Sequence, residues 1–294
     1  MFALVALWTM LSPTIGSLSQ ATPAWRVEAT SEGVQVRSAE GQWLATFTRG
    51  SRSVLLRGPQ RTFTEDTASH SVTHDRWVRV LGEPFSEEMD AEWLDRALQD
   101  RSPDVLGIAF QYVKGSPLIH EGKLRIAGDA SYGPKLSGKA VEEGSDYNDY
   151  LGVSVRYGVK RDLPEKRQFG SLDCSGFIRM VFGFRLGVPL GLASDGRKIP
   201  RRASQMYEDG PGVRLGSDRG KLQPGDLVFF DADKSDGTAI DHVGIFLGID
   251  TAGRPRFISS RKSADGPTMG DRKGASVLNG RGLYGASYRG ARRL

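Results

Sequence analysis

Two apolar runs in the C-terminal third of the chain most constrain what it can fold into. Residues 226–231 read DLVFFD and residues 242–249 read HVGIFLGI, with the polar stretch DADKSDGTAID between them. Short runs rich in β-branched and aromatic residues predict strands, and a short polar connection makes the two strands antiparallel neighbours. The segment RFISSRK, residues 256–262, predicts a third strand. The sequence therefore predicts an antiparallel sheet in this region.

A buried helix is predicted before these strands. The stretch CSGFIRMVFGFRLG, residues 174–187, is apolar enough to be covered on several sides. The predicted helix starts at or near Cys174, and its apolar pattern weakens toward Gly187. A helix followed by antiparallel strands is an α+β arrangement, which is the fold class that we expect for this part of the chain.

The first half of the chain has a different pattern of apolar and polar residues. Residues 25–50 and 53–63 alternate apolar and polar positions and are broken by EG, GS and GP turns, which predicts a β-meander reaching residues 77–81. Helical spacing predicts helices over 89–100 and 104–113. Residues 114–148 lack strong periodicity and are expected to form a connection, ordered or not. We therefore expect a β-rich domain over 25–113, the connection over 114–148, and a second domain over 149–294.

The first residues resemble an export signal. MFALVALWTML is uncharged and apolar, too short to cross a bilayer, and followed by small residues up to Ala21. We expect residues 1–24 to be a signal peptide of a secreted, cell-wall-associated protein without a membrane span. No Lys or Arg precedes the run, so the true start could lie elsewhere, or the segment could be an ordinary buried strand or helix.

The distribution of charged residues limits the classes of partner that the protein could bind. The chain carries a net charge of +5, and residues 251–294 hold ten Lys and Arg against two Asp. An anionic cell-wall polymer, an acidic membrane surface, nucleic acid or simply a solvated basic surface would each fit that excess. No recognition helix, zinc spacing or aromatic RNA platform is evident, which argues against nucleic acid. No metal-ligand cluster or nucleotide loop is evident either, so we expect no metal and no cofactor.

Cys174 is the only cysteine of the 294 residues. In an exported protein it cannot form an internal disulfide, so it is either a small buried hydrophobic residue or a reactive thiol. At a helix start, the positive end of the helix dipole would lower the pKa of the thiol. The unpaired main-chain N–H of Cys174 could also face the oxyanion that forms when a thiolate attacks a carbonyl.

A thiol nucleophile needs a base, and His242 is the strongest candidate among the four histidines. It begins an apolar strand in the same predicted domain as Cys174, whereas His70, His74 and His120 lie in polar segments. In a strand, His242 shares a face with Gly244, which leaves room beside the imidazole.

Three ordered motifs together carry a resemblance to a known family. DCSGF at 173–177, PGDLVFF at 224–230 and HVGIFLG at 242–248 resemble the NlpC/p60 family of bacterial cell-wall cysteine peptidases over residues 149–294. The resemblance implies a papain-like fold with the cysteine helix packed on the histidine sheet. It also implies hydrolysis of peptidoglycan stem peptides, most often at the bond between γ-linked D-glutamate and a diamino acid.

The resemblance assigns catalytic roles residue by residue. Cys174 takes the nucleophile position and His242 the general-base position. The third position, which orients the imidazole and is usually His, Asn or Gln, falls on Ser259. Ser260 or a main-chain carbonyl remains open for that role.

The resemblance also suggests residues that bind substrate. Asp173 and Ser175 flank the nucleophile where family members hold the amino end of the stem peptide, and Asp173 could also cap the helix. The place of a family tyrosine is taken by Val155, so Tyr157, two residues further on, becomes the candidate. Asp226 in the PGD turn is expected to be structural.

Other functions fit the same residues. A papain-like amidase or acyltransferase would use the same Cys and His pair on another substrate. A catalytically weak cell-wall-binding protein that has kept the fold is the alternative from a different class, and the serine at position 259 favours it.

Overall fold

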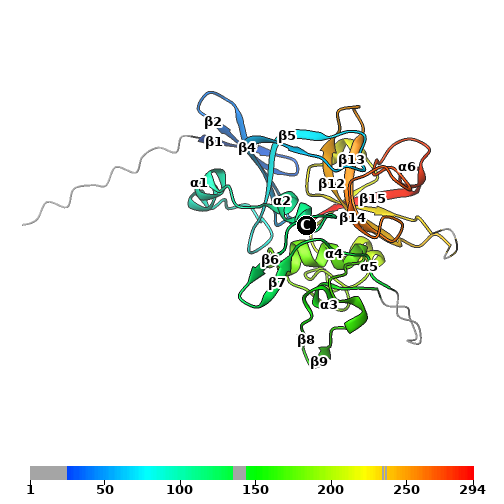
Figure 1. Ribbon diagram of the computed structural model, residues 1–294. Helices are drawn as coiled ribbons and strands as arrows, with labels where there is room; N and C mark the ends of the chain where they lie inside the picture. The colour runs from blue at the N-terminus through cyan, green and yellow to red at the C-terminus, as the bar shows by residue number, and fades with distance from the viewer. Residues whose placement is uncertain (1–24, 135–143, 234, 236) are drawn as a thin grey trace, which may run out of the picture.

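The structure is a computed structural model, and it describes residues 25–134, 144–233, 235 and 237–294. Figure 1 shows two β-rich parts side by side, with the helices α3, α4 and α5 below the second one. The predicted signal peptide, residues 1–24, lies outside the described residues, as do residues 135–143 of the predicted connection. None of the described helices is long and apolar enough to cross a membrane.

The first part is the β-meander that the alternating sequence predicted. Five strands pair antiparallel in chain order, and their inward residues form a small core with helix α1. Phe47 packs against Phe85 and Trp93 at ring-centroid distances of 5.2 and 5.8 Å. The elements are β1 (Trp25–Thr30), β2 (Gly33–Ser38), β3 (Trp43–Thr48), β4 (Ser53–Phe63), β5 (Val72–Val80) and α1 (Ala91–Gln99).

Aspartate side chains set the start of four helices. Asp90 accepts a hydrogen bond from the amide of Trp93 at α1, and Asp104 accepts one from Gly107 at α2 (Val105–Phe110). Asp146 and Asp173 do the same for α3 (Tyr147–Leu151) and α4 (Cys174–Ile178). An Asp at the N-cap satisfies amides that the helix itself cannot. The starts of both helices predicted in the first half are thereby confirmed.

The second part is a six-stranded sheet in the order β10-β15-β11-β12-β13-β14. The three predicted strands are its centre, and their antiparallel pairing is confirmed. The C-terminal strand β15, which the sequence did not predict, pairs with both β10 and β11. The strands are β10 (Val213–Gly216), β11 (Leu227–Phe230), β12 (His242–Ile249), β13 (Pro255–Arg261), β14 (Gly266–Thr268) and β15 (Tyr288–Arg293).

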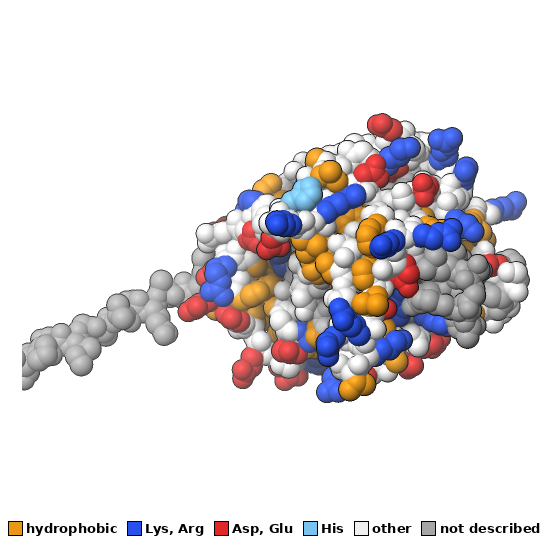
Figure 2. Space-filling model, turned by 60° about the horizontal axis from the view of Figure 1, so that its bottom comes forward, with side chains coloured by type: hydrophobic (Ala, Val, Ile, Leu, Met, Phe, Trp, Pro, Cys, Tyr) orange, Lys and Arg blue, Asp and Glu red, His pale blue; other side chains and the backbone are white. Residues whose placement is uncertain are grey.

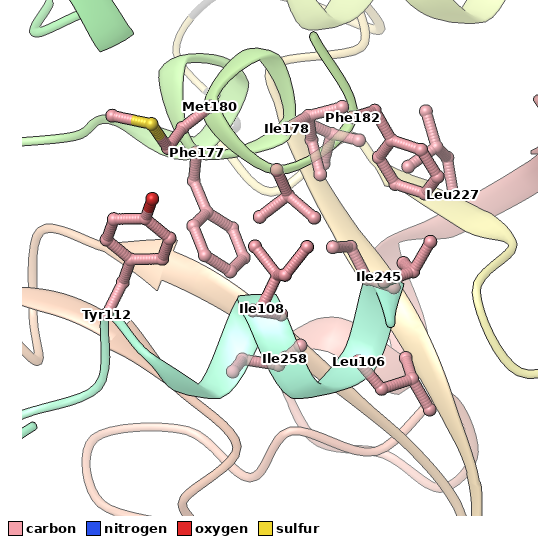
Figure 3. Packing of buried hydrophobic residues seen from close by; sticks show 14 of the residues in the cluster. Leu106, Ile108, Tyr112, Phe177, Ile178, Met180, Phe182, Leu227, Ile245 and Ile258 are labelled. Atoms are coloured by element: carbon pink, nitrogen blue, oxygen red, sulfur yellow. The ribbon is translucent and has the colours of Figure 1, made fainter. Parts of the chain in front are cut away.

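One face of this sheet packs against helices and forms the main core. Phe177 and Ile178 of α4 meet Ile245 and Ile258 of the sheet, and α2 inserts Ile108 from the first half of the chain (Figure 3). The opposite face carries Phe230, Phe257 and helix α6 (Leu283–Ser287). The predicted α+β class, with a β-rich region before the cysteine helix and its antiparallel sheet, is confirmed.

The two parts meet along several contacts. His74 of β5 has Nε2 2.9 Å from the main-chain oxygen of Leu247, and Thr48 accepts a hydrogen bond from Arg293 at 2.9 Å. Glu65 accepts hydrogen bonds from Thr268 and Met269. Because Thr268 lies opposite Ser259 in the sheet, Glu65 holds a strand next to the predicted site.

The remaining elements are short. The predicted connection contains a hairpin, whose EG turn is flanked by two brief strands, and the first residues of helix α3. A π-helix continues α4 over Arg179–Phe184, so the predicted helix is present but changes its hydrogen-bond pattern. These elements are β6 (Ile119–Glu121), β7 (Leu124–Ala127), β8 (Val155–Tyr157), β9 (Lys160–Asp162) and α5 (Ala203–Asp209), with 3₁₀ turns at Lys166–Gln168 and Arg219–Lys221.

Candidate functional site

Cys174 is the first residue of α4 and lies against the start of β12. The Asp173 carboxylate accepts a hydrogen bond from the Gly176 amide at 2.6 Å and so fixes where the helix begins. The Cys174 Sγ donates to the main-chain oxygen of Asp241 at 3.8 Å. The thiol therefore lies beside the backbone immediately before His242, although it is nearly buried, with 7% of the residue exposed.

His242 is the first residue of β12, and its ring is fixed on three sides. Its Nε2 lies 3.0 Å from the Oγ of Ser259 on β13. The ring packs between Phe230 and Tyr284, at centroid distances of 5.8 and 5.4 Å. Because Nε2 is engaged by the serine, Nδ1 is the ring nitrogen left for proton exchange. The structure thus pairs His242 with Ser259 and places Cys174 against the main chain next to His242.

Gly244 makes the approach of Ser259 to the imidazole possible. A Cβ at position 244 would lie 2.8 Å from the main-chain oxygen of Ile258 and 3.0 Å from the Cβ of Ser259. Neither backbone nor a β-carbon can move away cheaply, so a side chain would push β13 off β12. The space beside His242 that the sequence reserved for a helix end or a substrate is taken up by β13.

Burial sets the protonation states of this pair. It raises the pKa of the Cys174 thiol to about 12, helped by the negative charge of Asp173 and opposed by the Val243 amide and Arg201. It lowers the pKa of His242 to about 3, and the nearby positive charge of Arg261 acts in the same direction. The lowered thiol pKa expected from the helix start is therefore wrong for this conformation, because loss of water outweighs the dipole of a five-residue helix.

This burial predicts how stability depends on pH. The unfolded chain binds a proton at His242 near pH 6.5, whereas the folded protein does so only near pH 3. Proton binding therefore does not lower the unfolding free energy above pH 6.5, and the unfolding free energy decreases as the pH falls below that value. Relative to His242→Gln, the wild type should lose up to about 1.4 kcal/mol of unfolding free energy per pH unit. Urea unfolding of both proteins between pH 7 and 5 measures this, and a constant difference would contradict it.

Asp173 and Ser175, the predicted substrate-binding residues, are engaged by an arginine. Arg201 donates from Nη2 to Asp173 at 2.8 Å and from Nη1 to the Ser175 hydroxyl at 2.7 Å. Ser175 in turn donates to Asp173 at 3.1 Å. Sequence reasoning missed Arg201. Its only signal was a pair of arginines after Pro200, in a segment without a predicted element.

Tyr157 lies in a network around a buried arginine. Its hydroxyl accepts from Nη2 of Arg179 at 2.5 Å and donates to the hydroxyl of Tyr147 at 3.1 Å. These contacts fix β8 rather than the surroundings of Cys174. The pKa of Tyr132 is raised by burial first, and then by the nearby charges of Cys174 and Asp173.

The basic C-terminal region is less available to a partner than its charge suggested. Four of its arginines are buried, so the excess charge of residues 251–294 is partly internal. Arg256 pairs with Asp250, and Arg293 pairs with Asp226, which also caps the PGD turn as predicted. On the face in Figure 2, Lys and Arg are interspersed with Asp and Glu. The buried arginines are Arg256, Arg261, Arg292 and Arg293.

Comparison with known proteins shows a family similarity in the second part of the chain. The model of the NlpC/P60 family matches residues 152–269, and this family consists generally of cell-wall peptidases. The resemblance predicted from the three motifs is thereby confirmed. No curated protein sequence matches the chain.

Solved structures give weaker similarities. A Staphylococcus aureus protein described as similar to lipoprotein, NLP/P60 family, is 20% identical with a TM-score of 0.31, and the alignment covers 69% of this chain and 47% of that one. A Bacillus cereus NlpC/P60 family protein is 17% identical with a TM-score of 0.30, covering 92% and 78%. An NlpC protein of Trichomonas vaginalis is 14% identical with a TM-score of 0.33, covering 90% and 82%.

Proposed function

We propose that this protein, with its NlpC/P60 match over residues 152–269, is a secreted peptidoglycan endopeptidase that hydrolyses stem peptides. Cys174 is the nucleophile, His242 the general base and Ser259 the residue that orients the imidazole. One observation supports the proposal most: the single thiol lies against the backbone next to a histidine whose other ring nitrogen is held by a serine. The bond that we propose to be cleaved joins γ-linked D-glutamate to a diamino acid.

The protonation states suggest how the attack proceeds. Thiol and imidazole are both neutral near pH 7, so the proton leaves sulfur as the S–C bond forms. His242 takes this proton on Nδ1. The main-chain N–H of Cys174, in the first turn of α4, can donate to the oxygen that becomes negative.

The second half of the reaction returns the enzyme to its starting state. The imidazolium gives its proton to the leaving amine as the peptide C–N bond breaks, which leaves a thioester on Cys174. His242 then takes a proton from water as the water attacks the thioester. Sulfur departs, is protonated again, and the second fragment leaves as a carboxylate.

Ser259 is expected to contribute modestly, since it acts through His242. Ser259→Ala removes the hydrogen bond to Nε2 and should lower kcat/KM about tenfold, because an uncharged hydroxyl orients the ring without stabilising its charge strongly. Ser263→Ala, at an exposed serine after β13, is the matched control. Turnover of a defined stem peptide measures the change, and an unaltered kcat/KM would assign the third role elsewhere.

A second function is favoured by the burial of the thiol. A cell-wall-binding protein that has kept the fold would not need an accessible sulfur, and Cys174 is only 7% exposed. Mass spectrometry of a defined stem peptide incubated with the protein separates the two functions. Two complementary fragments support the endopeptidase. If the peptide stays intact while the protein co-sediments with purified peptidoglycan, the binder is supported.

The first part of the chain is proposed to position the catalytic part. Glu65 supports β14 next to the strand of Ser259, and α2 supplies Ile108 to the core beneath α4. These contacts make the β-meander a structural support for the site. Binding of the meander itself to cell-wall polymers remains a prediction from its position in the chain.

A further inference from the structure

Arg261 and Arg292 differ from the buried arginines that have charged partners, because both donate to main-chain oxygens instead. Arg179, Arg256 and Arg293 each contact a carboxylate at 2.8–2.9 Å. Arg261 is 2% exposed and donates to two main-chain oxygens, those of Gly274 at 2.5 Å and Gly270 at 3.1 Å. Its Nε has no acceptor, and no carboxylate among the described residues forms an ion pair with it. A buried charge without a counter-ion is costly, which calls for a reason.

The position of Arg261 relates it to His242. It follows Ser259 by two residues on β13, so both side chains leave the same face of the strand. Its guanidinium carbon lies 5.3 Å from the centre of the Tyr284 ring, and that ring lies 5.4 Å from the ring of His242. A fixed positive charge therefore stands one aromatic ring away from the imidazole.

Two carboxylates also lie close to the start of β12. Asp173 is neutralised by Arg201, and Asp241 accepts a hydrogen bond from the Asp233 amide. Helix α5 lies on the opposite face, where Tyr207 packs on Phe229. Strand β5 meets β12 at its far end, through His74. The groups near the imidazole are Cys174 and Asp173 at α4, Asp241 before β12, Arg261 on β13 and Tyr284 on α6.

We propose that Arg261 is a positioning residue that keeps His242 neutral at rest and makes its imidazolium a stronger acid. The proposal rests on the proposed function for its catalytic consequence. A nearby guanidinium disfavours a resting thiolate–imidazolium pair, so the proton moves only when a substrate carbonyl is attacked. The same repulsion drives the proton from the imidazolium to the leaving amine, which is a poor leaving group unless protonated.

Removing the charge should change two pH-dependent quantities. In Arg261→Met, the acidic limb of the kcat/KM profile should move to higher pH by about one unit, as expected for a charge several ångströms away at an effective dielectric constant near 20. Alkylation of Cys174 by iodoacetamide at pH 7 should become about tenfold faster, since the ion pair is then easier to form. Arg261→Lys, which keeps the charge, should stay near the wild type in both.

The controls separate charge from folding and from the proposed function. Arg272→Met removes an exposed arginine from the loop that holds the Arg261 guanidinium, and both profiles should remain unchanged. If Arg261→Met does not fold, Arg261→Gln removes the charge but can still donate to a main-chain oxygen. Alkylation tests Arg261 even when no stem peptide is cleaved, whereas absence of turnover alone contradicts only the proposed function. Alkylation rates and pH limbs equal to the wild type in a folded, uncharged variant would overturn the proposal.

Discussion

Replacing Cys174 by alanine is expected to reduce hydrolysis of purified peptidoglycan by at least about a thousandfold, because no other residue of the site can form the thioester. The substitution removes one sulfur atom from a residue that is 7% exposed, so the fold should persist. Release of new amino groups from peptidoglycan measures the activity, and thermal unfolding checks the fold.

Cys174→Ser provides the matched control for the shape of the site. It replaces sulfur by oxygen, keeps a hydrogen-bond donor toward Asp241, and should also be inactive, since an alcohol beside a weakly basic imidazole is a poor nucleophile. Folded Cys174→Ala that retains more than a tenth of wild-type activity would remove Cys174 from the reaction.

Replacing His242 by glutamine is expected to lower kcat/KM by about a hundredfold to ten-thousandfold, the range that general acid–base catalysis contributes. The glutamine amide can still reach Ser259, so the packing around β12 and β13 should be kept while the proton carrier is lost. The experiment measures turnover of a defined stem peptide between pH 5 and 9.

His120→Gln is the matched control for this substitution. His120 is exposed on the β6–β7 hairpin, and its replacement should leave kcat/KM unchanged. A folded His242→Gln variant with a wild-type pH profile would show that another group carries the proton.

Local patterns were sufficient to predict the central elements. Alternation predicted the β-meander, apolar runs predicted β11, β12 and β13, and the DCSG motif placed Cys174 at a helix start. Ser259 came from the resemblance to the NlpC/p60 family, and its contact with His242 depends on the pairing of β12 with β13 and on the glycine at position 244. These features depend on residues close in sequence or on neighbouring strands, which is where sequence patterns are informative.

The unpredicted features depend on partners far apart in the chain. Strand β15 reads YRGARR, which lacks an apolar pattern, and Arg293 is buried there because Asp226, 67 residues earlier, pairs with it. Arg201 reaches Asp173 in the same way. The pKa of Cys174 depends on how completely the sheet and helices exclude water, and a motif does not report that.

Because Cys174 is the only cysteine, the central claim can be tested by alkylating one site. Samples of the wild-type protein are treated with iodoacetamide for increasing times, and the modified fraction is read by intact-protein mass spectrometry. Each sample is then assayed for cleavage of a defined stem peptide into two fragments. We predict that the remaining activity equals the unmodified fraction throughout. Full cleavage by protein that is completely alkylated at Cys174 would contradict the account.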